Sequence, residues 1–435
     1  MKPWGVIFAL ALASCSSDSN PSPAKDMGSD VTTSQDVGLD APSGPPVLGE
    51  RPIAGQWWTG DFHVHASGAS NDTGGDSTPA AIKARALEIG LDFVVLTDHS
   101  NSTGSDTTTT VEDETLFNMG PEFPYWDEAA ALSDANFLMI DGNEMSPTDD
   151  GLGYKPRGHI GCYPRDLATF DPDIAFVDRP RGVVSGAQTI EQARAAGCFV
   201  TVNHPFGPAS WIAFDWTTRD YDAMEVYNGS AGWDFFDSQA IEGLKCDLAL
   251  GKDTRVLAGS DNHRVNIVYP GTVTNPPLGF PKTRVWAESL DWSQLLAGVD
   301  AGHISISDND VPFEFDLFDT SGQWLGFGGD EVDASEVAWA RLRGSSEGAD
   351  KARTLKVVEV VPDGCVDNRS GDLKPAPVAQ TNTVFEQAIE PGDAFEFVFA
   401  VQLKPNHAYL ATLLPDAAQG SMRFGIGITN SVRAK

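Results

Sequence analysis

The chain has 435 residues, 41% of them hydrophobic and 9% aromatic, and a formal net charge of −33 from 29 Lys and Arg against 62 Asp and Glu. This length and apolar fraction allow a full core and two or three domains, and 43 Gly and 28 Pro without a short repeat exclude collagen and coiled coils. The acidic excess opposes neutralisation of many phosphates, so we expect no long nucleic acid as a partner.

The first residues predict an export signal. An apolar stretch from Val6 to Ala13 follows Lys2 and is too short to cross a bilayer. The run Leu12-Ala13-Ser14-Cys15 resembles the lipobox of bacterial lipoproteins. This resemblance implies a signal peptide over residues 1–14 and lipidation of Cys15, and a plain signal peptide is the alternative.

Residues 15–50 are rich in Ser, Asp, Pro and Gly and predict a flexible, disordered tether. We therefore expect an exported protein that is lipid-anchored in the bacterial cell envelope and that meets the membrane through its lipid only. Ser16 after Cys15 favours the outer membrane.

From Arg51 onward, strand-like apolar runs alternate with helical stretches. The predicted strands are Trp57–His65, Asp92–Thr97, Asn136–Ile140, Phe199–Asn203, Ala223–Tyr227, Arg255–Ala258 and Arg284–Ala287. The predicted helices are Thr78–Ile89, Trp126–Leu132, Ala187–Ala196, Trp233–Leu250 and Trp292–Ala301. This order predicts an α/β domain over residues 51–308 with a mainly parallel sheet, either a barrel or a doubly wound layer.

The pattern changes after Asp308. Short alternating runs such as Phe313–Phe318 and Phe395–Ala400 are bounded by Gly, Pro and Asp. They predict a small antiparallel β domain of sandwich type over residues 309–435. The sequence leaves open the oligomeric state and the pairing of Cys162, Cys198, Cys246 and Cys365, for which three complete pairings exist.

Six of the eight histidines stand at the carboxyl ends of predicted strands, where parallel α/β folds build their active sites. His63-Val64-His65 places two imidazoles on one side of a strand, and Asp261-Asn262-His263 repeats this spacing. Burying this many imidazoles and carboxylates together is unfavourable unless cations offset their desolvation. We therefore predict a metal cluster. His303 and His407 lie outside this pattern and are interpreted as structural.

Taken in order, these motifs resemble the PHP superfamily, the polymerase and histidinol phosphatase metallohydrolases. The motifs are His63-x-His65, Thr97-Asp98-His99, Glu144, His159, His204 and Asp261-x-His263. The resemblance covers about residues 57–306. The trailing β domain, ending in Gly427–Asn430, is most similar to the exported carbaryl-hydrolase-like branch.

The resemblance implies a distorted, TIM-like (βα)7 PHP barrel with a trinuclear metal centre. The first ion is expected on His63, His65, Glu144 and Asp261. Glu144 is expected to bridge to a second ion on His159 and His204. The third is expected on His99, His263 and one loop acid, either Asp72 or Asp76, while Asp98 orients a ligand without binding metal.

The ligand types suit divalent Zn, Mn or Fe, and an activated bridging hydroxide follows as the nucleophile. Three divalent ions exceed the negative charge of Glu144, Asp261, one loop Asp and the hydroxide, which favours a small anionic substrate. Arg264 is a candidate catalytic residue that clamps such an anion, with a surface salt bridge as the alternative.

The leading hypothesis is a metal-dependent phosphoesterase acting on small phosphate esters or on nucleotide or oligonucleotide ends. A carboxylic or carbamate ester hydrolase using the same metals is the second hypothesis. The third is a metal-stabilised surface binding lipoprotein without turnover.

Overall fold

A computed structural model describes the chain over residues 44–67, 73, 75–99, 125–145, 158–170, 185–207, 218–229, 232–268, 276–366, 376–416 and 424–435. The chain divides into residues 1–43 and one compact unit, Gly44–Lys435. Residues 1–43, which include Cys15, lie outside the described ranges. Within the described ranges, no helix is long and apolar enough to cross a membrane.

The first part of the compact unit contains two groups of buried strands. One group is β1 (Gln56–Val64), β2 (Phe93–Leu96) and β3 (Leu138–Asp141), in which β2 lies parallel to both neighbours. The other is β4 (Asn143–Met145), β5 (Ile160–Pro164), β6 (Cys198–Val202), β7 (Ala223–Asn228) and β8 (Arg255–Gly259). Single parallel bridges, Val64 to Asn262 and His99 to Glu144, join the ends of the two groups.

In the described ranges, five helices lie at the places where the sequence predicts them. They are α1 (Pro79–Glu88), α3 (Tyr125–Leu132), α5 (Gly186–Ala195), α7 (Phe235–Ala249) and α8 (Trp292–Ala301). Local capping fixes several of their starts: the Thr78 side chain accepts a hydrogen bond from the Ala81 N–H, and Ser185 and Asp234 form capping boxes.

The strand order departs from a simple parallel arrangement at β5, which runs antiparallel to both β4 and β6. The sequence predicts His159 at the carboxyl end of a strand. In the structure, Glu144 lies inside β4 and His159 directly precedes β5. Strands β4 and β5 have only three and five residues, which is too short for periodicity alone to reveal this reversal.

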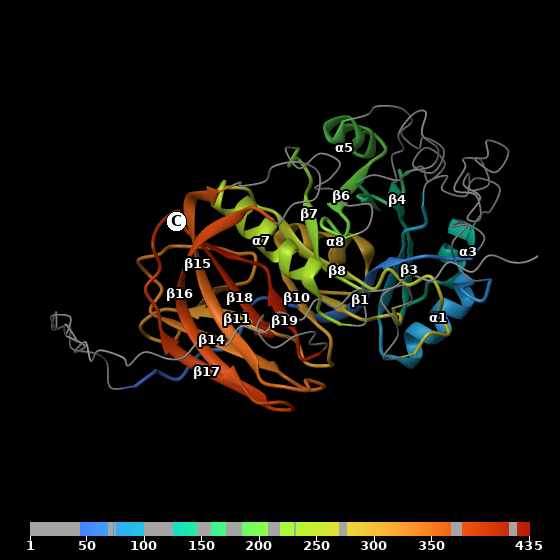
Figure 1. Ribbon diagram of the computed structural model, residues 1–435. Helices are drawn as coiled ribbons and strands as arrows, with labels where there is room; N and C mark the ends of the chain where they lie inside the picture. Colours follow the sequence, from blue (N-terminus) through green and yellow to red (C-terminus); the bar gives the residue numbers. More distant parts are fainter. Residues whose placement is uncertain are drawn as a thin grey trace, which may run out of the picture. The chain divides into compact units, whose positions relative to one another are not determined.

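A continuous sheet crosses the predicted boundary at residue 308. After β8, strand β9 (Lys282–Ala287) pairs antiparallel with β1 and with β10 (Ile304–Ser307). Strand β10 then pairs with β19 (Gly427–Thr429), which belongs to the C-terminal part. Strands β1, β2, β3, β9 and β10 of the first part therefore share one hydrogen-bonded sheet with strands of the C-terminal part, while β4–β8 form a sheet of their own (Figure 1).

The C-terminal part is almost entirely antiparallel β structure. Its other strands are β11 (Glu314–Phe318), β12 (Trp324–Phe327), β13 (Glu331–Val332), β14 (Trp339–Ser345), β15 (Arg353–Val366), β16 (Val378–Ile389), β17 (Ala394–Ala400), β18 (Ala408–Leu414) and β20 (Val432–Ala434). Strands β12, β11, β14 and β17 form a separate sheet. Its Leu317 and Leu342 share a buried cluster with Leu355 and Tyr409 of the long sheet, so the two sheets pack face to face.

Two disulfides settle the cysteine pairing that the sequence leaves open. Cys162–Cys198 joins the adjacent strands β5 and β6. Cys246–Cys365 joins α7 to β15 and so links the first part to the C-terminal part, where α7 packs against β15 and β16 (Figure 1).

Candidate metal centre

The end of β1 supplies two buried imidazoles. His63 and His65 are both fully buried, and their ring centroids lie 5.2 Å apart, while Val64 between them packs in an apolar cluster. Strand β8 ends at Gly259, and the absence of a side chain at this residue allows β8 to approach β1 closely. A Cβ atom on residue 259 would lie only 2.3 Å from the Cβ of His63. The structure therefore brings the two motifs, His63-Val64-His65 and Asp261-Asn262-His263, next to each other.

Glu144 is the common acceptor of the site. Its carboxylate is buried and lies within 3.3 Å of four imidazoles, with a fifth, that of His65, at 3.7 Å. The distances from its oxygens are 2.9 Å to His99 Nδ1, 3.1 Å to His159 Nδ1, 3.1 Å to His204 Nε2 and 3.3 Å to His63 Nε2. Asn203 also donates a hydrogen bond of 2.9 Å to Glu144 Oε1, which helps to hold the carboxylate in place.

Asp261 is the second carboxylate and faces the β1 pair. Its Oδ1 atom lies 3.1 Å from His65 Nε2 and 3.3 Å from His63 Nε2. Asp261 and His204 have positive φ angles of 54° and 28°, a backbone conformation that non-glycine residues rarely adopt. Such strain persists where the surrounding structure enforces it, and it often marks functional sites.

The ligand atoms form four overlapping groups in which all atoms lie within 4.8 Å of one another. The groups are His65, His99 and His263; His63, His65 and Glu144; His63, His204 and Asp261; and His99, Glu144 and His159. All six predicted histidines, Glu144 and Asp261 therefore come together. His204 shares its group with His63 and Asp261, whereas the family resemblance places it with His159.

The carboxylates and imidazoles perturb each other's protonation. Burial opposes the charge on His63, but Asp261, Glu144 and Glu225 together raise the pKa of His63 well above its usual value. Burial lowers the pKa of His65 to about 3 and that of His159 to about 4. Burial would raise the pKa of Glu144, yet His159, His63 and His99 hold it well below its usual value.

The orphaned atoms of the cluster suit divalent cations. Within the described ranges, His159 Nε2 is buried without a hydrogen-bond partner, and His63 Nε2 and His159 Nδ1 have only the Glu144 and Asp261 carboxylates beside them, at 3.1–3.3 Å. Buried polar atoms normally have partners, and imidazole with carboxylate is the donor set that Zn, Mn and Fe accept. The residues that are present therefore fit a metal centre.

The remaining predicted residues lie at or beyond the edge of this cluster. Asp72 lies outside the described residues. Asp76 belongs to none of the four groups, and its Oδ2 accepts a hydrogen bond of 2.6 Å from Asn266. Arg264 is exposed, directly after His263. Asp98 accepts a hydrogen bond of 2.7 Å from the Ala66 N–H, which places it behind the ligands.

His303 and His407 lie outside the four groups, in agreement with their structural interpretation. His303 Nε2 lies 3.0 Å from Asp330, and His407 Nδ1 lies 2.9 Å from Glu359.

Two carboxylates outside the predicted ligand set support the cluster. Glu225 is buried in β7, and its Oε1 lies 3.0 Å from His63 Nδ1. Asp61 accepts backbone hydrogen bonds from His63, Ser260 and Gly279. The period of two along β1 carries a signal for Asp61, which points to the same side as His63 and His65.

Comparisons with known proteins give similarity to solved structures only. No family model matches the chain, and no curated protein matches it. It resembles a lesion-specific endonuclease from Pyrococcus furiosus, endonuclease Q, with 16% identity and a TM-score of 0.39 over 58% of each chain. The chain thus spans little more than half the length of that enzyme.

Two further structures are similar. A two-domain protein containing a predicted PHP-like metal-dependent phosphoesterase, from Bacteroides vulgatus, has 14% identity and a TM-score of 0.37 over 88% of this chain and 99% of that one. PsfC from Pseudomonas syringae has 18% identity and a TM-score of 0.32 over 53% of this chain and 82% of that one.

Proposed function

We propose that this chain is a metal-dependent hydrolase of the PHP superfamily that cleaves small phosphate esters or nucleotide or oligonucleotide ends. One observation carries the proposal: six imidazoles and two carboxylates converge, with their ligand atoms in four overlapping groups. A structural histidine needs one partner, as His407 has in Glu359. A cluster of this size is explained by cations.

The residues of the cluster take defined roles in this proposal. His63, His65, His99, His159, His204, His263, Glu144 and Asp261 hold the ions, and Glu144 is shared because its oxygens face four imidazoles. Bound divalent cations supply Lewis acidity and lower the pKa of a bound water to near neutrality. Three ions in a distorted (βα)7 barrel remain the finer proposal, and the overlap of the ligand groups supports more than one ion.

The charge of the site supports an anionic substrate. Glu144 and Asp261 are the carboxylates in the four groups, so two or three divalent ions leave the centre positive. The exposed guanidinium of Arg264 follows His263 and is free to reach outward toward a phosphate oxygen. This local positive charge offsets the overall acidity of the chain for a small anion.

We further propose that the protein is exported and held in the outer membrane by a lipid on Cys15. Two disulfides support an oxidising compartment, since such bonds are rare in the cytosol. The β-rich C-terminal part supports assignment to the exported carbaryl-hydrolase-like branch.

The test is turnover by the purified, metal-loaded chain on p-nitrophenyl phosphate, bis-p-nitrophenyl phosphate and p-nitrophenyl acetate, with elemental analysis of the same sample. We expect chelator-sensitive phosphate ester hydrolysis that His63→Ala abolishes. His407→Ala is the matched control, because it removes a paired histidine outside the cluster.

The same assay decides between the alternatives. If only p-nitrophenyl acetate is hydrolysed, the substrate is a carboxylic or carbamate ester and not a phosphate ester. Stoichiometric metal without any turnover supports a binding lipoprotein. A chain without stoichiometric transition metal contradicts the proposed centre altogether.

A further inference from the structure

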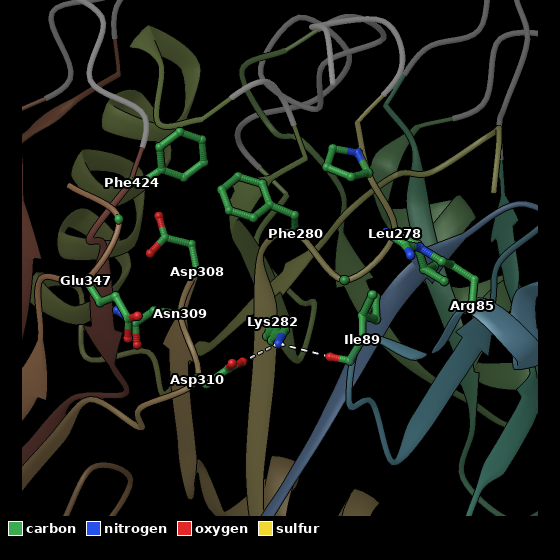
Figure 2. A pocket seen from close by; sticks show the side chains of 13 residues that line it. Arg85, Ile89, Leu278, Phe280, Lys282, Asp308, Asn309, Asp310, Glu347 and Phe424 are labelled. Atoms are coloured by element: carbon green, nitrogen blue, oxygen red, sulfur yellow. Dashed lines mark hydrogen bonds and ion pairs between the residues drawn. The ribbon is translucent and has the colours of Figure 1, made fainter. Parts of the chain in front are cut away.

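A cavity of about 710 Å³ lies where β9 and β10 meet the end of α1. Figure 2 shows its lining, which includes Ile89, Leu278, Phe280, Lys282, Asp308 and Phe424. None of the proposed metal ligands lines it. Its volume falls in the range of small-molecule sites, which combine apolar walls with a few placed polar groups.

Two aromatic rings form the apolar side of the cavity. The ring centroids of Phe280 and Phe424 lie 5.0 Å apart with an interplanar angle of 60°. Both side chains are only half-buried, so part of each ring faces open space. In Figure 2, both rings lie close to Asp308. Aromatic faces carry partial negative charge and attract cations within about 6 Å of the ring centre.

Asp308 offers an unused carboxylate oxygen. Its Oδ1 accepts backbone hydrogen bonds of 3.1 Å from Gly425 and 3.0 Å from Ile426. Its Oδ2 is buried and has no hydrogen-bond partner among the described residues. Burial raises the pKa of Asp308 to about 7, against these two hydrogen bonds and the more distant Arg353. A buried acceptor without a partner is unfavourable, and a bound donor relieves it.

The basic side chains of the cavity are already neutralised. Lys282 Nζ lies 2.5 Å from Asp310 Oδ1 and donates to the Ile89 carbonyl at 3.3 Å, as Figure 2 shows. Arg85 is paired with Glu88 at 2.8 Å. Glu347 adds another carboxylate at the exposed edge. The charge left to recognise a ligand is therefore negative.

We propose that this cavity binds a small organic cation with an apolar body, whose ammonium group lies against Asp308 and the faces of Phe280 and Phe424. The apolar body contacts Ile89 and Leu278 on the opposite wall. A hydrophobic wall, two aromatic faces and an unpaired carboxylate are the elements that recognise an amphipathic ammonium. A phosphate ester is a poor ligand here because the unpaired charge has the same sign.

The test is isothermal titration calorimetry of the full, metal-loaded chain with 3-phenylpropylammonium, whose N–H groups can donate to Asp308 Oδ2, and with neutral 3-phenyl-1-propanol as the comparison of the same shape. We expect saturable binding of the cation and at least tenfold weaker binding of the alcohol. Asp308→Asn keeps an oxygen that accepts the Gly425 and Ile426 N–H groups but removes the charge, so it is expected to weaken cation binding at least tenfold. Glu396→Gln, an exposed acid on β17, is the control and leaves binding unchanged.

Phe424→Leu tests the aromatic wall independently and covers the case in which the Asp308 variant fails to fold. It retains apolar volume but loses the ring, so the cation is expected to lose affinity more than the alcohol does. Three results overturn the proposal: no binding of the cation, equal binding of the two probes, or unchanged cation binding in both variants. Binding is measured without turnover, so a failure of the proposed hydrolase activity does not affect the outcome.

Discussion

The Nδ1 atom of His63 lies 3.0 Å from Oε1 of Glu225. The other oxygen of Glu225 accepts hydrogen bonds from the His204 backbone N–H at 2.7 Å and from the Asn228 side chain at 2.9 Å. A carboxylate in this position selects the tautomer in which Nδ1 carries the proton. The Nε2 atom of His63 is thereby left to face Glu144 and Asp261, where a cation is proposed.

Glu225→Gln is expected to weaken metal binding by about 10–100-fold, the usual effect of losing a partner that orients a ligand. The glutamine amide has a single acceptor oxygen. It can therefore accept a hydrogen bond either from His63 Nδ1 or from the His204 N–H and the Asn228 side chain, but not from both sides. The measurement is metal affinity by competition with a chromogenic chelator. Glu359→Gln is the matched control, since Glu359 is also a buried glutamate beside a histidine, His407, but lies outside the cluster. Equal affinity in both variants would show that packing alone orients His63.

Glu144→Gln is expected to remove at least one ion per chain and to reduce turnover more than about 100-fold, beyond the effect of residues that only support ligands. The physical reason is the loss of the one negative charge that faces four imidazoles. Elemental analysis and steady-state rates check it. Asp98→Asn retains an oxygen that accepts the Ala66 N–H. It is therefore expected to reduce turnover by no more than about 100-fold, as for other residues that only support ligands. A metal-replete Glu144 variant contradicts the shared role of Glu144.

Removal of the Cys246–Cys365 disulfide by double substitution to Ala is expected to lower the free energy of unfolding by about 2–4 kcal/mol. The bond closes a separation of 119 residues and links α7 to β15. Denaturant titration measures the change. The Cys162–Cys198 pair spans 36 residues, so its loss is expected to destabilise the chain less through chain entropy. It is expected to weaken metal binding more, because β5 and β6 lead to His159 and His204. The reverse order of the two effects would refute this assignment.

Asp308 predicts a specific dependence of stability on pH. Burial raises its folded pKa to about 7 from an ordinary value of 3.8. Between these values the folded chain holds a proton that the unfolded chain has lost, so stability falls as pH rises from about 4 to 7 and then levels off. Asp308→Asn lacks this decline, so its melting temperature is expected to exceed that of the wild type by a few degrees at pH 8 and by less at pH 5.

Thermal melts of both proteins at a fixed metal concentration check this prediction. Burial also raises the pKa values of Asp61 and Asp141 to about 6, so both proteins lose stability in part of the same window. The difference between the two curves isolates Asp308. A difference that does not change with pH contradicts the perturbed pKa.

The sequence predicts the elements of the first part well because their signals are local. Helix α8 spans the predicted Trp292–Ala301, and α1 differs from its prediction by one residue at each end. The six histidines were predicted to meet for the same reason: side chains at the carboxyl ends of parallel strands gather at one edge of a sheet. The structure brings all six together, and their role as metal ligands stays a prediction.

The features that the sequence does not predict depend on contacts between residues far apart in the chain. The reversal of β5 is not visible in the five apolar residues of that strand. The role of Glu225 depends on the distance between β7 and β1. The cysteine pairing depends on which helix packs beside β15. The cavity beside Asp308 combines residues from α1 to Phe424, so no local pattern contains it.

The sheet that joins β10 to β19 also constrains how the chain can fold. Strand β10 pairs through Ser305, Ile306 and Ser307 with residues 427–429, and β18 pairs with the same strand. A chain emerging from the ribosome in order leaves the edge of β10 open while more than a hundred further residues are made. The first part therefore completes its sheet only after synthesis has passed residue 429.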